Sequence, residues 1–211
     1  MIAQRVIRSL AGLIVPAIAV AAALAVGAIM MILLGADPIA GYSALFSGAF
    51  GGPDELADTA LRAMPLLLVG VGICIAFRAG VINIGGEGQI ILGAIASTIV
   101  ALALPDLPRI ILVPLVLLAG AVGGGFWGAI PGALKAYAGV NEILSTIMLN
   151  IVAAQFLSFL LQDLLIEKGE NGIKIQQTER LSENSHLPLL PGGTRLHLGV
   201  LVAIGIAILG Y

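Results

Sequence analysis

The sequence predicts an all-α fold, a polytopic transmembrane helical bundle, from its composition and from the spacing of its charges. Of its 211 residues, 59% are hydrophobic and 10% are charged, whereas soluble domains carry about 25% charged residues. The mean hydropathy is +1.10. Charge-free intervals alternate with short polar segments, and roughly 20 apolar residues suffice to cross a bilayer. We therefore expect about six spans in one transmembrane domain covering residues 1–211.

The charge-free intervals mark the expected spans in chain order. They are Ser9–Ala36, Ala63–Phe77, Gly88–Pro105, Ile110–Leu134, Ile143–Gln162 and Leu196–Tyr211. The second has only 15 residues, and such a helix rises about 22 Å, less than the ~30 Å hydrocarbon core. We expect the polar segment that follows to complete this span. The last interval stops at the C-terminus while still short, so we expect a chain truncated at that end.

The first two segments predict a retained N-terminal span and a helix at the membrane interface. Arg5 and Arg8 precede an apolar run that is far longer than the ~7–15 residues of a signal-peptide core. In residues 35–60, aromatic side chains recur every four positions, at Tyr42, Phe46 and Phe50. That spacing is typical of a short amphipathic helix lying at the interface.

Residues 77–89, FRAGVINIGGEGQ, place polar side chains and glycines directly between two apolar runs. Four glycines there allow a turn or an unwound backbone, since glycine reaches positive φ without steric cost; they are Gly80, Gly85, Gly86 and Gly88. Within a membrane, a polar segment whose helix is interrupted by glycines is tolerated only where protein or a water-filled cavity supplies hydrogen-bond partners for its backbone. The candidate pathway or gate residues are Arg78, Asn83, Glu87 and Gln89, with Asn150 from a later span.

Glu87 has two interpretations. An uncompensated carboxylate at the bilayer centre costs roughly 2.5–3.5 kcal/mol, so we expect it to pair with Arg78 or with the backbone N–H groups of the glycine turn. It either clamps the second and third spans together or contacts a solute. Asn83 and Gln89 offer neutral hydrogen bonds suited to hydroxyl groups. Two aromatic residues either stack on a solute ring or simply pack, namely Phe77 and Trp127.

The fourth and fifth spans carry a glycine face and a polar connection. Glycine recurs every four residues at Gly120, Gly124, Gly128 and Gly132, which predicts close helix packing. The connection that follows contains Lys135, Asn141 and Glu142, and Asn141 is a possible helix N-cap. Asn150 lies inside the next apolar run, so it makes either an interhelical hydrogen bond or a pathway contact.

Residues 163–195 predict an extramembrane loop, since they lie outside any apolar run and are too few for a domain with its own core. His186 and His197 have no third ligand nearby, so we expect no metal or other cofactor. Cys74, the single cysteine, is expected to be a small buried hydrophobe. The net charge of −2 argues against nucleic acid as a partner.

The basic residues predict a cytoplasmic N-terminus. That orientation places Arg5, Arg8, Arg78 and Lys135 inside; Arg62, Arg109 and the four bases of the long loop fall outside. The number of basic residues is then larger outside than inside, which does not follow the positive-inside rule, but the charges flanking the first span usually dominate the orientation of the chain. None of the three lysines lies in a GxxxxGK[ST] phosphate-binding loop. The chain also lacks the GxSxG and HExxH motifs, so we expect no enzymatic activity in it.

Three strings carry a family resemblance. They are LRAMPLLLVGVGICIAFRAG, FRAGVINIGGEGQIILGA and GAIPGALKAYAGVNEILSTIMLNIVA, within residues 35–160. The chain resembles permease subunits of ATP-binding-cassette importers, most closely the nucleoside/simple-sugar group within the ribose/branched-chain amino-acid permease family. The resemblance implies a bacterial inner-membrane protein that forms the pathway for a nucleoside or simple sugar. It also implies three partners: a second permease subunit, the same or related; cytoplasmic ATPases that hydrolyse ATP; and an extracytoplasmic substrate-binding protein.

In the family it resembles, the helix that docks on the ATPase usually lies in the second half of the chain, so Lys135, Asn141 and Glu142 form at most a secondary ATPase-facing loop. Two other classes stay open. An ion- or proton-coupled secondary transporter also uses broken helices, but it would usually place acids or histidines deep in several spans. A membrane scaffold packed by the glycine face would not explain the polar cluster at residues 83–89.

Overall fold

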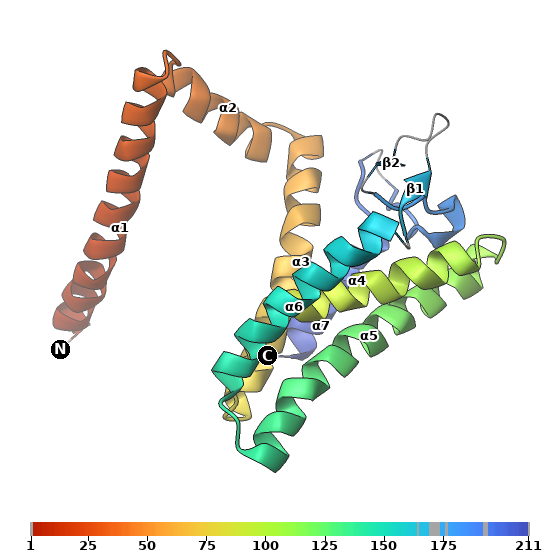
Figure 1. The fold of residues 1–211 in the computed structure, drawn as a ribbon. Helices are drawn as coiled ribbons and strands as arrows, with labels where there is room; N and C mark the ends of the chain where they lie inside the picture. The colour runs from red at the N-terminus through yellow and green to blue at the C-terminus, as the bar shows by residue number, and fades with distance from the viewer. Residues whose placement is uncertain (1, 164, 169–173, 176, 192–193, 211) are drawn as a thin grey trace. The chain divides into compact units, whose positions relative to one another are not determined.

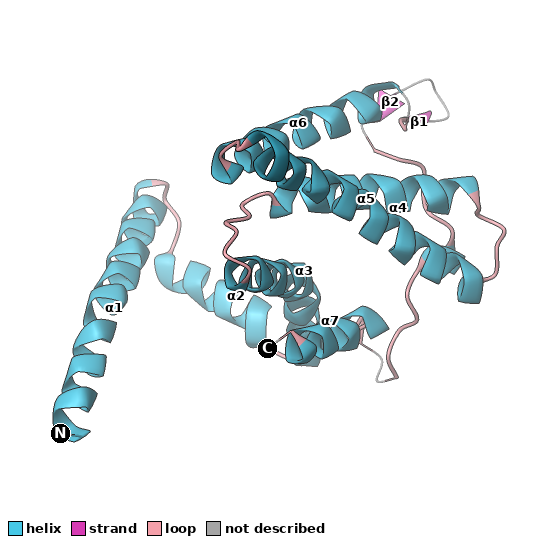
Figure 2. Cartoon of the chain, turned by 90° about the horizontal axis from the view of Figure 1, so that it is seen from below, coloured by secondary structure: helices cyan, strands magenta, loops and turns pink. Residues whose placement is uncertain are grey.

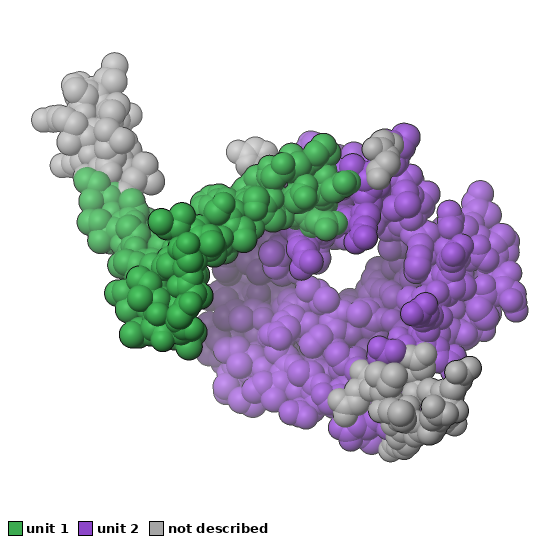
Figure 3. Space-filling model, turned by 90° about the horizontal axis from the view of Figure 1, so that it is seen from above, with its two compact units in different colours: residues 1–59 green, residues 60–211 purple. Residues whose placement is uncertain are grey.

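The computed structural model describes residues 2–163, 165–168, 174–175, 177–191 and 194–210, and most of them are helical (Figures 1 and 2). The helices are α1 (Ile2–Leu33), α2 (Pro38–Phe50), α3 (Pro53–Arg78), α4 (Gly86–Ala103), α5 (Arg109–Ala138), α6 (Glu142–Asp163) and α7 (Leu198–Leu209). Two short strands, β1 (Glu167–Lys168) and β2 (Lys174–Ile175), pair antiparallel, and a 3₁₀ turn, η1, spans Glu183–Ser185. The chain divides into two compact units, residues 1–59 and 60–211 (Figure 3).

Five of the described helices are long and apolar enough to cross a membrane. They are the Ile14–Leu33 part of α1, and α3, α4, α5 and α6. The sixth expected span corresponds to α7, which is apolar but has only 12 residues. The predicted helical, multi-span class is therefore confirmed.

In the first unit, α2 forms within the segment where a short helix was predicted. Pro38 occupies its first turn, and the Asp37 carboxylate accepts a hydrogen bond from the Ile39 N–H at 2.8 Å, which caps the helix. The Tyr42 hydroxyl donates to the Leu24 carbonyl of α1 at 2.5 Å. Tyr42 therefore ties the two helices together, while Phe46 and Phe50 are exposed.

The expected boundary of the second span was wrong. Helix α3 begins at Pro53, ten residues before the charge-free interval, because proline at the first position and the acidic residues Asp54 and Glu55 in the first turn favour a helix start. Its 26 residues rise about 39 Å, so the polar segment is not needed to complete the span. Cys74 on this helix is exposed rather than buried.

In the second unit, α4 and α5 pack with their backbones in close approach. A Cβ atom added at Gly93 of α4 would lie 2.9 Å from the Gly120 carbonyl oxygen, and one at Gly124 would lie 3.0 Å from the Gln89 carbonyl oxygen. Only residues without side chains permit this spacing. The Ser97 hydroxyl also donates to the Val116 carbonyl at 2.9 Å.

Helix α5 contains two prolines, Pro114 and Pro131, and Pro131 is buried. At the other end of this helix, the Arg109 guanidinium donates to the Glu183 carbonyl at 3.0 Å, which ties the loop between α6 and α7 to the start of α5. The described residues of that loop form β1, β2, η1 and an isolated antiparallel bridge between Leu189 and His197 before α7 begins. Among the described residues, no three histidine, cysteine, aspartate or glutamate side chains lie close enough together to hold a metal ion.

Candidate functional site

The polar segment begins at a glycine turn that ends α3. Gly80 has a φ of +74°, in the left-handed region. The Gly80 N–H donates to the Phe77 carbonyl and the Val81 N–H to the Ala76 carbonyl, both at 3.0 Å. This pair of bonds is a Schellman motif, which satisfies the last carbonyls of a helix and needs a residue that tolerates positive φ. Gly80 thus fills the turn role predicted from the sequence.

The other three predicted turn glycines lie at the start of α4, where they allow close approach and do not adopt positive φ. The Asn83 side-chain oxygen accepts from the Gly85 N–H at 2.8 Å, which shapes the entry into the helix. A Cβ atom at Gly85 would lie 3.2 Å from the Thr146 side chain of α6, and one at Gly86 would lie 3.0 Å from Val69 of α3. Small residues here let three helices meet.

Asn150 of α6 joins this segment to the bundle with both ends of its side-chain amide. Its oxygen accepts from the Gly88 N–H at 2.9 Å, and its nitrogen donates to the Ile84 carbonyl at 3.0 Å. The first N–H groups of a helix have no partner within the helix, so Asn150 caps α4 from another helix. An interhelical hydrogen bond was one of the two interpretations of Asn150, and the geometry supports it.

Trp127 of α5 completes the surroundings of Gly88. A Cβ atom at Gly88 would lie 2.8 Å from the Trp127 indole nitrogen and 2.9 Å from the Asn150 side-chain oxygen. The indole nitrogen is buried and has no hydrogen-bond partner among the described residues. The sequence suggested only stacking or packing for Trp127; its position against Gly88 carries no sequence signal, because the two residues lie on different helices.

Glu87 and Arg78 are not joined as expected. Glu87 lies in the first turn of α4 with its side chain exposed, and within the described part of the chain it forms no ion pair. Arg78, also exposed, ends α3. Clamping by an Arg78–Glu87 ion pair is therefore absent from this structure, and the first-turn position itself favours the Glu87 carboxylate through the helix dipole.

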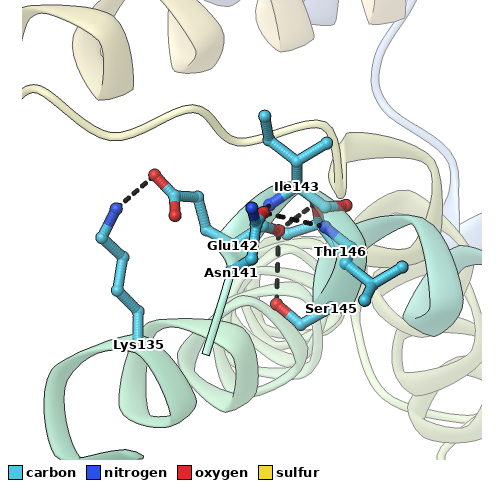
Figure 4. Close-up of polar contacts among 7 residues, drawn as sticks. Lys135, Asn141, Glu142, Ile143, Ser145 and Thr146 are labelled. Atoms are coloured by element: carbon cyan, nitrogen blue, oxygen red, sulfur yellow. Dashed lines mark hydrogen bonds and ion pairs between the residues drawn. The ribbon is translucent and has the colours of Figure 1, made fainter. Parts of the chain in front are cut away.

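The ion pair that does form in this region joins Lys135 at the end of α5 to Glu142 at the start of α6 (Figure 4). The Lys135 side chain is 41% exposed and that of Glu142 is 17% exposed. Between them, the Asn141 side-chain oxygen accepts from the Ile143 N–H at 2.9 Å and the Leu144 N–H at 3.3 Å, so the N-cap expected at Asn141 is present. The pair and the cap together fix the α5–α6 connection.

Two cavities adjoin these residues. Cavity 1, of about 410 Å³, lies between the ends of α3, α5 and α6; its polar lining comes from Asn83, Lys135, Glu142 and Thr146. Cavity 2, of about 530 Å³, lies between α3, α4 and α5; its polar lining comes from Asn83, Gln89 and Ser97. Of the predicted pathway residues, Asn83 and Gln89 therefore line cavities, whereas Arg78, Glu87 and Asn150 are not part of either lining.

The four glycines predicted to pack α5 have different surroundings. Gly120 and Gly124 face α4, where added Cβ atoms would meet the Ser97 hydroxyl and the Gln89 backbone. Gly128 faces the Gln89 side chain. No described atom lies within 4 Å of the Cβ position at Gly132. The glycine face therefore contacts α4 from Gly120 to Gly128 and borders cavity 2 along the same stretch, whereas Gly128 and Gly132 border cavity 1.

The family model that matches the chain is described as "Branched-chain amino acid transport system / permease component", and it covers residues 56–209. No solved structure shows a significant match.

Three curated relatives are similar over almost the whole chain. A guanosine ABC transporter permease protein of Bacillus subtilis is 37% identical over 96% of this chain and 58% of its own length. A glucose ABC transporter permease protein of Haloferax volcanii is 37% identical over 93% of this chain and 53% of its own length. A nucleoside ABC transporter permease protein of Lactococcus lactis is 35% identical over 90% and 54%. The chain thus spans little more than half the length of these relatives.

Proposed function

Because the chain belongs to the family of branched-chain amino acid transport system permease components, we propose that it is a permease subunit of an ATP-driven, binding-protein-dependent importer. It is a multi-pass membrane protein. Its solute is a nucleoside or a simple sugar, the classes named for the similar permeases. ATP hydrolysis belongs to a separate partner subunit, so the chain itself contributes a pathway and not a catalytic site.

One observation carries the proposal beyond family membership. The polar segment between α3 and α4 is hydrogen-bonded to α6 through Asn150, and its Asn83 lines both cavities. Non-helical backbone next to membrane spans is stable only where protein satisfies it or where it lines a cavity, and this segment meets both conditions. Broken segments of this kind commonly mark the solute path of transporters.

The proposed roles follow from the positions of the residues. Asn83 and Gln89 contact the solute, since they line the cavities. Asn150 positions the segment, and Glu87 and Arg78 act as gate residues at its ends. Lys135, Asn141 and Glu142 form the end of the α5–α6 connection, which faces the ATPase as a secondary contact.

This arrangement requires the N-terminus to be cytoplasmic in the bacterial inner membrane. The α5–α6 connection is then cytoplasmic as well, so a green fluorescent protein fused after Gly139 should be fluorescent. Alkaline phosphatase fused at the same position should be inactive.

Purification from native membranes in mild detergent, followed by mass spectrometry of the proteins that stay bound, tests the proposal. We expect an ATPase with a phosphate-binding loop, a second permease subunit of the same or a related kind, and a substrate-binding protein. An unrelated multi-pass protein from the same membranes is the control. Recovery of the protein alone, together with solute uptake driven by an ion gradient without ATP, would contradict the proposal in favour of a secondary transporter.

A further inference from the structure

The two cavities meet at one place on α5. Their linings share two residues, Asn83 from the polar segment and Gly128 from α5. Gln89 of α4 lies at this shared boundary: its side-chain nitrogen is 2.7 Å, and its amide carbon 3.1 Å, from where a Cβ atom at Gly128 would be. The Gln89 side chain therefore lies against the bare backbone of Gly128, on the cavity 2 side of a residue that lines both cavities.

The side-chain amides of Gln89 and Asn83 have donors or acceptors that are not used in hydrogen bonds among the described residues. Within the described residues, the Gln89 side chain makes no hydrogen bond that would hold its amide in place. The Asn83 side chain uses its oxygen for the Gly85 N–H, which leaves its two N–H donors pointing elsewhere. Hydroxyl groups on a passing solute can bond to both donors and acceptors of this kind.

The charges near the cavities favour a neutral solute. The lining of cavity 2 contains no charged side chain among the described residues. In the lining of cavity 1, Lys135 and Glu142 are paired with each other, so they neutralise one another. An ionic solute would find no opposite charge to offset its loss of hydration.

We propose that Gln89, lying against Gly128, is the partition between the two cavities and the group that recognises a neutral, hydroxyl-bearing solute as it passes from one to the other. The proposal rests on the proposed permease function and adds the residue pair that sets passage and selectivity. Gly128 is required because a side chain there would occupy the space that the Gln89 amide now fills.

Two glycines outside the cavities supply matched controls for this idea. Gly128→Ala places a methyl group against the end of the Gln89 side chain, which is flexible, so Gln89 must turn away while the backbone stays in place. Gly70 of α3 and Gly205 of α7 line neither cavity, and no described atom lies within 4 Å of either Cβ position. Alanine at these two positions adds the same methyl group to an apolar helix without touching Gln89 or the cavity linings.

The experiment measures initial uptake of radiolabelled guanosine and glucose by cells that carry the gene, its deletion, or single substitutions made in place. We expect deletion to abolish uptake of one of these solutes. Gly128→Ala and Gln89→Leu should each lower the initial rate about tenfold, as one misplaced group in a fitted site does. Gly70→Ala and Gly205→Ala should retain the wild-type rate within about twofold, a change too small for the loss of such a contact.

A second measurement separates recognition from a structural role. Gln89→Leu should reduce the preference for the hydroxylated solute over its deoxy analogue, 2′-deoxyguanosine or 2-deoxyglucose, because the amide that bonds the hydroxyl is gone. Membrane abundance of each variant is measured by quantitative mass spectrometry. Loss of the Gly128→Ala protein from the membrane would overturn the argument that only the end of Gln89 must move.

The outcomes distinguish the two proposals. If deletion leaves uptake of both solutes unchanged, the permease proposal fails and this inference fails with it. If deletion abolishes uptake but Gly128→Ala transports as well as Gly70→Ala and Gly205→Ala, the permease proposal stands and the partition is refuted. An unchanged preference between hydroxylated and deoxy solute in Gln89→Leu would refute recognition by the Gln89 amide.

Discussion

Replacing Asn150 with alanine tests the interhelical cap most directly. The substitution removes both hydrogen bonds that the side chain makes to the polar segment, one with the Gly88 N–H and one with the Ile84 carbonyl. Gly88 is buried, so its N–H cannot turn to water in the present packing. Alanine also suits a helix, so any loss of stability has to come from the tertiary contacts.

The size of the effect follows from the two bonds. A net contribution of about 0.5–1.5 kcal/mol for each hydrogen bond gives a loss of about 1–3 kcal/mol in the free energy of unfolding. Interhelical hydrogen bonds in membranes average about 0.6 kcal/mol, which sets the lower end of this range. Asn150→Asp keeps the acceptor for the Gly88 N–H but cannot donate to the Ile84 carbonyl when ionised, so we expect it to be less stable than wild type as well.

The single tryptophan of the chain makes the assay local. Trp127 lies against Gly88, so its emission reports the packing at the start of α4. Unfolding of the purified protein in detergent, followed by this emission during titration with denaturant, gives the free-energy change. The emission maximum of Asn150→Ala before unfolding should shift to longer wavelength as water reaches the site.

Ser158→Ala is the matched control, since the Ser158 hydroxyl bonds only within α6, to the Ala154 carbonyl. It should leave both the unfolding midpoint and the emission maximum close to those of wild type. An Asn150→Ala protein that unfolds at the wild-type denaturant concentration with unchanged emission would refute the cap as a stabilising contact.

Two further predictions concern neighbouring contacts. Gly88→Ala places a methyl group against the Trp127 nitrogen and the Asn150 oxygen, so it should lower the free energy of unfolding by about 1–3 kcal/mol in the same titration. Gly72→Ala is the control, because its Cβ position has open space and its free energy of unfolding should stay near the wild-type value. Equal stabilities of the two variants would contradict the packing around Gly88. Lys135→Glu and Glu142→Lys should each lower the melting temperature, and the double exchange should recover part of the loss; no recovery would mean that the pair does not couple the two helices.

The charge-free intervals predicted most helices because a long apolar run has few alternatives to a membrane helix. The ends of helices α4, α5 and α6 all lie within four residues of the ends of their predicted intervals. The rule failed at α3, where it stopped at Arg62 although the helix continues to Pro53. A helix can carry charged residues beyond its apolar section, so charges mark the edge of an apolar interval and not the end of a helix.

The candidate site was predictable in composition but not in pairing. The sequence indicated that Asn150 needs a partner, since a polar side chain in an apolar run rarely faces lipid. Its partners lie 62 and 66 residues away in the chain, a distance that no local pattern encodes. Asn141 was predictable because an N-cap is local. Glu87 was expected to pair with Arg78 or with backbone N–H groups of the glycine turn; it forms no ion pair in the described part of the chain, and it lies in the first turn of α4, where the helix dipole favours a carboxylate.

The two prolines of α5 have a consequence for movement. Proline has no N–H, so Pro114 and Pro131 each leave the carbonyl four residues earlier, at Ile110 and at Trp127, without its helical donor. Bending α5 therefore costs least at these two points. The stretch between them carries the glycines that hold α5 against α4. Helix α5 thus has two points where it bends at least cost, one near each end of its contact with α4, and the second lies beside Gly128, where the two cavities meet.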